Sequence, residues 1–389
     1  MNQYYILVKI GEGTFSEVLK AKSMITGQLV AIKCMKNRCE SVDQVKNLKE
    51  IQALHQLSQH PNIVKLHEVL YDEPSGRLAL VCELMEMNLY DCIKNRTSYL
   101  SMAKVKKYMY QVLKALDYMH KRNFFHRDIK PENILIKNDN VKVADLGSCK
   151  GVHSTHPYTE YISTRWYRAP ECLMTDGYYD QKMDLWGVGC VMFEIIALLP
   201  LFQGENELDQ INKIFKILGT PEPELLSRFK SQASHMEFNF KQQKGIGLER
   251  LVPPHAGSDC IDLLYKLLQL DPIKRITAEE ALRHEFFEEF WDAPMSQSSD
   301  STQFGKAITI AKPKKRLNKG IYPGTIKLEV KLEGKLNQSD DENEKVRDGS
   351  LNSKLPPITK PHLKPKVKNP YAKKKLYDDY IIVGKKAFN

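Results

Sequence analysis

The sequence lacks the cysteine spacing of a zinc site or of a disulfide framework. Its eight cysteines never form a Cys-x-x-Cys pair, and most stand among apolar residues, as Cys82 does directly after Val81. Closely spaced pairs are typical of structural zinc, and dense, regular cysteines are typical of small secreted domains. We therefore expect free thiols in a reducing compartment.

The chain also lacks a signal-type start and a clear membrane span. Residues 1–13 do not have the basic-then-apolar order of a secretory signal. The longest apolar run, residues 185–202, approaches membrane length, but it contains Glu194 and reaches Pro200. We interpret this run as a buried core helix and expect no transmembrane segment. These absences favour a cytoplasmic protein.

Excess positive charge is scarce over most of the chain and concentrated at its end. Residues 301–389 hold 21 of the 58 Lys/Arg and 9 of the 48 Asp/Glu, so they carry +12 and residues 1–300 carry −2. The polar, Lys/Pro-rich composition after about Pro294 cannot easily bury a core, and we expect most of this tail to be disordered. Residues 312–316 resemble a nuclear import signal, although basic runs are more often merely solvated. The tail could equally bind acidic protein partners, nucleic acid or anionic membrane.

Short strands dominate the start of the chain and helices dominate the rest. The strands that we expect cover residues 4–10, 18–21, 30–34 and 78–83. Between them, residues 45–57 carry Val45, Leu48, Ile51, Leu54 and Leu57 at helical spacing. From about Met87 onward helical patterns prevail, and residues 219–257 have the composition of an insert of short helices and loops. The order of elements indicates an α+β protein.

Two features near the start could hold a nucleotide's phosphates. Residues 11–18, with Gly11 and Gly13, lie between two expected strands, where glycine lets a backbone close over phosphates. Glycine is also common at ordinary hairpin turns, so this signal is weak alone. Lys33 stands inside an apolar strand, where lysine is usually an edge residue. It is a candidate to bind the α- and β-phosphates, with Glu50 of the next helix as its ion partner.

A second group of polar residues supplies what phosphoryl transfer further requires. Residues 126–133 read His-Arg-Asp-Ile-Lys-Pro-Glu-Asn. Asp128 would orient the attacking hydroxyl, Lys130 would offset charge on the transferring phosphate, and Asn133 would bind magnesium. Asp145 supplies a second metal ligand after a short strand. His-Arg-Asp alone could be a solvated loop, but Asn133 and Asp145 follow at the offsets of a kinase site.

Taken together, residues 4 to about 290 resemble a eukaryotic protein kinase catalytic domain. Further motifs stand in that family's order: Asp145-Leu146-Gly147, Ala169-Pro170-Glu171, Asp184 at the start of a central helix, and Arg275 as partner of Glu171. The resemblance implies a bilobal fold with a catalytic domain at residues 4–287. A small β-rich N-lobe would cover about 4–85, and a larger α-helical C-lobe about 86–287. The basic tail would cover 288–389.

The resemblance also implies a nucleotide site for ATP and Mg²⁺. The residues expected around ATP are Ile10, Gly11, Glu12, Gly13, Val18, Ala31, Lys33, Glu83 and Met85. Cys82 stands at the gatekeeper position, and so small a side chain would leave the pocket behind adenine open. Leu146 replaces the family's usual phenylalanine but is also apolar, so activity should survive.

The segment before Glu171 resembles a dual-phosphorylation switch. Thr159 and Tyr161 flank one glutamate, as in the kinase group that contains cyclin-dependent and mitogen-activated kinases. An upstream kinase or autophosphorylation would modify them. The alternative is an inert loop.

Four cations could bind the added phosphates, because arginine binds phosphate through two parallel hydrogen bonds. Arg127, helped by Lys49, would meet phosphorylated Thr159. Arg165 and Arg168 would meet phosphorylated Tyr161.

The same resemblance implies protein substrates with serine or threonine before proline, and Thr164 would line the proline pocket. Residues 44–50 do not match the helix by which cyclin-dependent kinases recognise cyclins, so we expect no cyclin. Related kinases are associated with cilia and flagella, which makes the cilium and the nucleus alternatives to the cytoplasm. The competing hypothesis is a pseudokinase scaffold that only binds nucleotide while its tail recruits partners.

Overall fold

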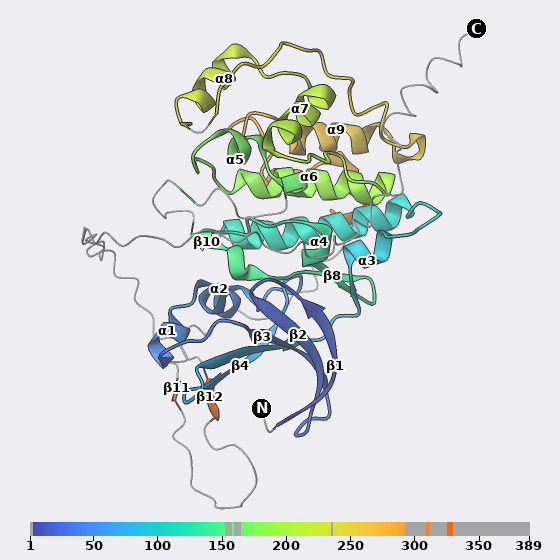
Figure 1. Ribbon diagram of the computed structural model, residues 1–389. Coiled ribbons are helices and arrows are strands. Elements are labelled where there is room, and N and C mark those ends of the chain that lie inside the picture. The colour runs from blue at the N-terminus through green and yellow to red at the C-terminus, as the bar shows by residue number, and fades with distance from the viewer. Residues whose placement is uncertain are drawn as a thin grey trace, which may run out of the picture. The chain divides into compact units, whose positions relative to one another are not determined.

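A computed structural model describes residues 3–151, 158, 165–234 and 236–291, together with the backbone of short strands at 309–310 and 325–329. The described residues belong to one compact unit, in which a sheet-rich part precedes a helical part (Figure 1). The α+β fold of two lobes predicted from the sequence is therefore confirmed.

Five antiparallel strands form the N-lobe sheet in the order β1-β2-β3-β5-β4. They are β1 (Tyr4–Glu12), β2 (Ser16–Ser23), β3 (Leu29–Met35), β4 (Leu66–Asp72) and β5 (Arg77–Glu83). Beyond β4, the sheet continues with β12 (Thr325–Glu329) and then β11 (Thr309–Ile310), both antiparallel to their neighbours. The rest of the tail, for which we expected disorder, lies outside the described residues.

The helix expected at residues 45–57 is in fact two helices, α1 (Val42–Lys46) and α2 (Lys49–Leu57). Leu48 separates them with an extended backbone, at φ −63° and ψ 122°. Its partly buried side chain still packs against the core, so the apolar spacing persists although the helix does not. That difference shows that spacing alone does not report a helix break.

Short strands and helices make up the C-lobe. Up to residue 151 they are β6 (Met87–Asn88), α3 (Leu89–Ile93), α4 (Met102–His120), β7 (Phe124–Phe125), η1 (Pro131–Asn133), β8 (Ile134–Lys137), β9 (Asn140–Val143), η2 (Leu146–Ser148) and β10 (Lys150–Gly151). From residue 165 onward they are η3 (Arg165–Tyr167), α5 (Pro170–Met174), α6 (Lys182–Ala197), α7 (Glu207–Leu218), α8 (Pro223–Lys230), η4 (Pro254–Ala256), α9 (Ser258–Leu267), α10 (Ala278–Leu282) and η5 (Glu285–Phe290). Within 219–257 the described residues form α8, η4 and loops, as predicted for the insert.

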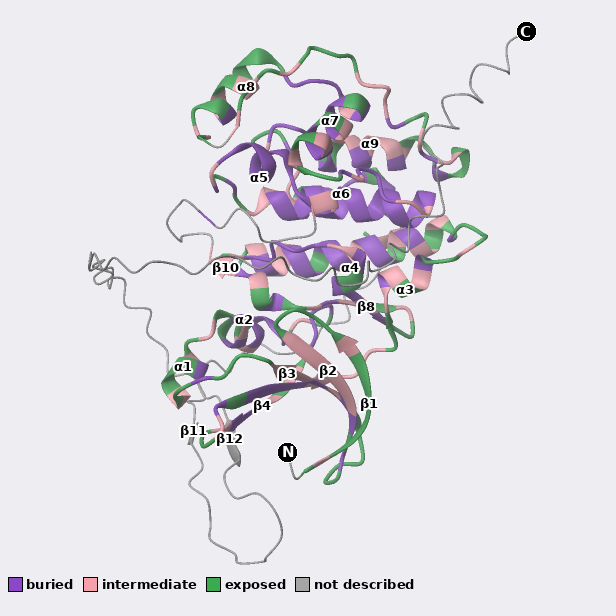
Figure 2. Cartoon of the chain, viewed as in Figure 1, coloured by how far each residue is buried: buried purple, intermediate pink, exposed green. Residues whose placement is uncertain are grey.

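Helix α6 is the centre of the C-lobe core. Every residue from Met183 to Ala197 is buried, and α4 and α9 pack against it (Figure 2). It ends at Leu198, which adopts the left-handed conformation with φ 59°. Residues 185–197 of the apolar run thus lie in a core helix, as predicted, and residues 198–202 follow its end. Within the described part of the chain, no helix has the length and hydropathy needed to cross a membrane.

Candidate active site

Strand β3, helix α2 and the loop after β9 bring three charged side chains together. Lys33 Nζ lies 2.6 Å from Glu50 Oε1 and 2.8 Å from Asp145 Oδ1. Burial favours the neutral amine of Lys33, but the charges of Asp145 and Glu50 outweigh it and raise the Lys33 pKa. Burial likewise opposes charge on Asp145, yet Lys33 holds its pKa below the usual value. The group is therefore an ionised lysine between two carboxylates.

Gly147 allows this close approach of α2. A Cβ added at Gly147 would lie 3.3 Å from Glu50 Oε2 and 3.4 Å from Asp145 Oδ1, tighter than most real contacts. Asp145 itself adopts the left-handed conformation, at φ 60°. Next to it Leu146 is fully buried, so leucine fills the internal position expected for an apolar side chain.

The loop before Asp128 is held by hydrogen bonds to the first turn of α6. Asp184 accepts hydrogen bonds from the backbone nitrogens of His126 and Arg127, both at 2.8 Å, and lies 2.9 Å from His120 Nε2. Arg127 has a left-handed backbone, with φ 68°, which these bonds support. Asp184 is buried, which opposes its charge, but the bond to His120 lowers its pKa. The sequence placed Asp184 at the start of a central helix, and the structure adds that Asp184 positions the loop before Asp128.

Asp128 points one carboxylate oxygen at its neighbours and leaves the other available. Oδ2 accepts from Lys130 Nζ at 2.7 Å and from Asn133 Nδ2 at 3.0 Å. Oδ1 is buried and has no hydrogen-bond partner among the described residues. A buried polar atom is normally paired. The arrangement therefore suits an incoming hydroxyl as the missing partner.

The donor set beside Asp128 fits a magnesium ion. Asn133 uses its amide nitrogen on Asp128, which leaves its amide oxygen as a possible ligand. The Asn133 carbonyl accepts from Ala144 N at 2.9 Å, and this bond places Asn133 beside the residue before Asp145. One carboxylate and one amide oxygen match the few protein ligands that Mg²⁺ takes when phosphates supply the others.

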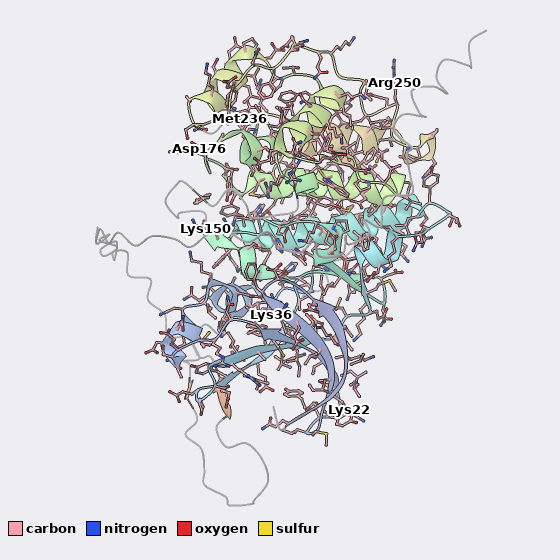
Figure 3. All side chains as sticks on the ribbon, viewed as in Figure 1. Lys22, Lys36, Lys150, Asp176, Met236 and Arg250 are labelled. Atoms are coloured by element: carbon pink, nitrogen blue, oxygen red, sulfur yellow. The ribbon has the colours of Figure 1, made fainter. Side chains whose placement is uncertain are left out.

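The glycine-rich turn joins β1 to β2, and the side chain of Lys36 binds to it. Gly13 N donates to Ser16 O at 2.8 Å. Lys36, which Figure 3 labels, contacts Glu12 Oε1 at 3.1 Å and Gly13 O at 2.7 Å through its Nζ. Lys36 was not among the residues expected from the sequence. Lys36 thus holds Glu12 beside the turn, and its positive charge could also attract phosphates.

The residues expected around adenine lie on β1, β2 and β3, at the end of β5 and in the hinge that follows β5. Ala31 of β3 pairs with Cys82 of β5 in the sheet register. Val18, Ala31, Cys82, Glu83 and Met85 are half-buried, and Ile10 is exposed. Burial raises the pKa of the Cys82 thiol to about 12, so this thiol stays neutral.

The arginines expected to bind activating phosphates already have protein partners. Arg127 NH1 donates to the Tyr179 hydroxyl at 3.1 Å. Arg165 NH1 donates to Glu205 O at 3.1 Å, and buried Arg168 pairs with Glu207 at 3.0 Å. Thr159, Tyr161 and Thr164 lie outside the described residues.

Lys150, which the sequence reasoning missed, belongs near this group. Lys150 is labelled in Figure 3. Burial is the main cause of its lowered pKa, and the neighbouring charges of Arg127 and Lys49 contribute. Lys150 of β10 is therefore repelled by one cation of α2 and by one of the 126–133 loop. Lys150 follows Asp145 by five residues in the sequence, but nothing in that spacing reveals its neighbours.

The predicted pair between Glu171 and Arg275 is present. The guanidinium binds both carboxylate oxygens, at 2.6 Å and 2.9 Å. Both side chains are buried, and the pair ties α5 to the segment after α9.

Comparison with known proteins agrees with this architecture. The model of the family described as protein kinase domain matches residues 4–287. Over 289 residues the chain is 54% identical to human (Homo sapiens) MAPK/MAK/MRK overlapping kinase, covering 74% of this chain and 68% of the relative. Serine/threonine-protein kinase MAK of Mus musculus is 42% identical, and the match covers 74% of this chain and 46% of that kinase. Cyclin-dependent kinase F-4 of Oryza sativa subsp. japonica is 41% identical over 288 residues, and the match covers 74% of this chain and 62% of that kinase.

Sequence motifs, lobe architecture and the Lys33 ion pairs therefore agree with the family match. The chain belongs to the protein kinase family, and its relatives include the MAPK/MAK/MRK overlapping kinases.

Proposed function

We propose that the protein is an ATP- and magnesium-dependent kinase that phosphorylates serine and threonine in other proteins. The observation that carries this proposal is the joined set of Lys33, Glu50 and Asp145, with Asp128 nearby on a buried loop. A scaffold that only binds nucleotide needs no oriented carboxylate at Asp128.

Each side chain has a separate task in the transfer. Lys33, held by Glu50, binds the α- and β-phosphates and so fixes the nucleotide. Asp128 Oδ1 accepts the hydrogen bond of the substrate hydroxyl and aims its oxygen at the γ-phosphorus. Lys130, bound to the other oxygen of Asp128, offsets negative charge on the transferring group. Magnesium, when held by Asn133 and Asp145, supplies positive charge that neutralises the phosphates.

We further propose that the catalytic domain spans residues 4–287, with lobes at 4–85 and 86–287, and that residues 288–389 form a separate tail. The fold elements described above support the division, because β5 ends at Glu83 and β6 begins at Met87. We propose the cytoplasm as the location, with the nucleus or cilium as alternatives. The tail's excess of +12 suits acidic partners.

Activation by phosphate on Thr159 and Tyr161 is part of the proposal. The repulsion of Lys150 by Arg127 and by Lys49 supports it, since a bound anion would relieve that repulsion. Arg168 would have to exchange its ion pair with Glu207 for the phosphate on Tyr161.

Proline-directed specificity, with Thr164 beside the substrate's proline, and independence from cyclin complete the proposal. A peptide array that shows no preference for proline after the phosphorylated residue would contradict the specificity. Thr159→Ala and Tyr161→Phe proteins should lose most activity, and full activity in both would contradict the switch.

The decisive experiment compares the full chain with Asp145→Asn. Both are incubated with ATP, Mg²⁺ and a basic protein substrate, and phosphate incorporation is measured. The wild type should transfer phosphate and Asp145→Asn should fall to background, because it loses a metal ligand and a partner of Lys33. Equal background from both would favour the scaffold hypothesis.

A further inference from the structure

Strand β4 of the N-lobe sheet is paired on its outer side with a segment of the tail. β12 runs antiparallel to β4, with Ile326 opposite Tyr71 and Leu328 opposite Val69 (Figure 1). Since β5 lies on the other side of β4, β4 would form the edge of the sheet if β12 were absent. The unpaired backbone groups of a strand of seven residues can bind any extended chain that reaches them. The edge of β4 is therefore a docking surface, and β12 occupies it.

The sequence around β12 alternates as a strand with one apolar face does. Apolar residues stand at 326, 328, 330 and 332, and charged residues stand at 327, 329, 331 and 333. Successive residues of a strand lie on opposite faces of a sheet, so this period of two is typical of a half-buried strand. The alternation is independent of the pairing with β4. It also distinguishes the segment from the polar, Lys/Pro-rich composition that predicts disorder for the tail.

The register brings the apolar residues of β12 to the buried face of β4. Residues directly opposite each other in antiparallel strands share a face of the sheet, so Ile326 and Leu328 belong to the face of Tyr71 and Val69. Tyr71 and Val69 are 0% and 1% exposed and belong to the main hydrophobic core. A slip by one residue would move the apolar residues of β12 to the opposite face. The observed register is thus the one that suits the alternation.

The opposite face of β4 carries an acidic residue on each side of Leu70. Lys327 stands opposite Leu70 in the register. Glu68 and Asp72 are two residues away in either direction and therefore share the face of Leu70. Each carboxylate also accepts a hydrogen bond from a hydroxyl group, which does not neutralise it. Opposite charges at neighbouring cross-strand positions favour pairing, so Lys327 suits this position in the register.

The connection to β12 is long enough for the segment to dock on its own chain. Residues 292–324 span up to about 110 Å when fully extended. A segment tethered in this way competes at an effective concentration near the millimolar range, well above that of a second copy in dilute solution. Tethering therefore favours the chain's own segment over the same segment of another molecule.

We propose that the edge of β4 is a strand-docking site, which the chain's own residues 325–329 occupy and thereby close to strands of other proteins. The site selects an extended segment with alternating apolar and charged residues and a cation opposite Leu70. Backbone hydrogen bonds supply the affinity, and alternate residues supply the selectivity. With the segment docked, the sheet ends at β11, whose two residues offer little edge for further pairing. This inference goes beyond the proposed function and does not depend on phosphoryl transfer.

Hydrogen–deuterium exchange on the full chain compares wild type with the double variant Lys327→Pro/Leu328→Pro. Neighbouring residues of a strand direct their N–H groups to opposite edges, so two adjacent prolines remove one donor on each side of β12. The β4 amides should exchange about two- to tenfold faster in the variant. The control Lys354→Pro/Leu355→Pro changes the same residue types outside β12 and should match wild type.

A labelled peptide of residues 322–334 tests the site directly by fluorescence anisotropy. It should bind the Lys327→Pro/Leu328→Pro protein, whose edge is open. Wild type should bind it at least about tenfold more weakly, because the tethered segment competes. A peptide with Lys327→Glu should bind the double variant about three- to tenfold more weakly than the unchanged peptide, and high salt should reduce this difference. A scrambled peptide without the alternation should not bind.

Equal exchange of β4 in wild type and the double variant would overturn the proposal, as would equal peptide binding by both proteins or by neither. Faster exchange throughout the variant, including the buried helix α6, would show general unfolding and would also count against a local docking site. Protection of β4 that disappears when wild type is diluted would assign the strand to a second copy and overturn docking within one chain. Because none of these measurements uses ATP, an inactive wild type would contradict the proposed function and leave this test intact.

Discussion

Substituting Arg275 by methionine should destabilise the C-lobe strongly, because it leaves a buried carboxylate without its partner. Arg275 and Glu171 are 0% and 1% exposed at their side chains. The guanidinium also donates to Gln269 O at 3.0 Å and to Lys182 O at 2.9 Å. It lies 5.3 Å from the ring centre of Trp186. Methionine can replace the packing on this ring but none of the hydrogen bonds.

The expected loss follows from these contacts. Removing one partner of a buried, hydrogen-bonded ion pair costs about 3–5 kcal/mol. For a domain of this size, that loss lowers the melting temperature by roughly 6–15 °C. Arg275→Lys should recover only part of the loss, since one ammonium group cannot bind both carboxylate oxygens in the same plane.

Urea unfolding followed by circular dichroism measures the free energy of unfolding for wild type, Arg275→Met, Glu171→Gln and the double variant Glu171→Gln/Arg275→Met. The double variant should be more stable than the single one, because it no longer buries an unpaired charge. A loss below about 1 kcal/mol in Arg275→Met, the value typical of exposed pairs, would refute the reasoning. So would a double variant as unstable as the sum of both single changes.

Three further substitutions test the site and its surroundings. Cys82→Phe should weaken bulky adenine-mimicking inhibitors by tenfold or more, since one small side chain leaves the pocket open; equal inhibitory concentrations for both proteins would contradict this. Gly147→Ala should lower kcat severalfold by pressing on Glu50, and a steady-state assay that finds wild-type kcat would disprove the crowding argument. Glu194 has a pKa raised to about 8, because burial outweighs the bond from Tyr167. Its contribution to stability is therefore largest below its ordinary value of 4.5 and is lost as pH rises through about 8. Glu194→Gln should lose less stability than wild type between pH 6 and 9, as melting temperatures would show; parallel pH profiles would exclude a titrating Glu194.

Much of the site followed from the chemistry that phosphoryl transfer demands. Few other residue types could perform the tasks that phosphoryl transfer assigns to Lys33, Asp128, Asn133 and Asp145. These four residues also occur in a recognisable order along the chain. Their mutual contacts, such as the 2.8 Å between Lys33 and Asp145, required the fold, because 112 residues separate the two in the chain.

Other positions carried no chemical signal in the sequence. Lys142 appears there as an ordinary lysine in a short strand, and only the pairing of lobes places it 2.7 Å from Glu83. Lys36 and Lys150 are likewise unremarkable until the glycine-rich turn and the 126–133 loop approach them.

The sequence by itself determined the fold class, the family and the central helix α6, because hydrophobic spacing and motif order are local or sequential properties. Only the tertiary structure decided the break at Leu48, the hydrogen bonds by which Asp184 holds the loop before Asp128, and the ion pair between Lys142 and Glu83. Those features depend on which distant surfaces meet. Their stabilisation comes from partners that spacing along the chain does not encode.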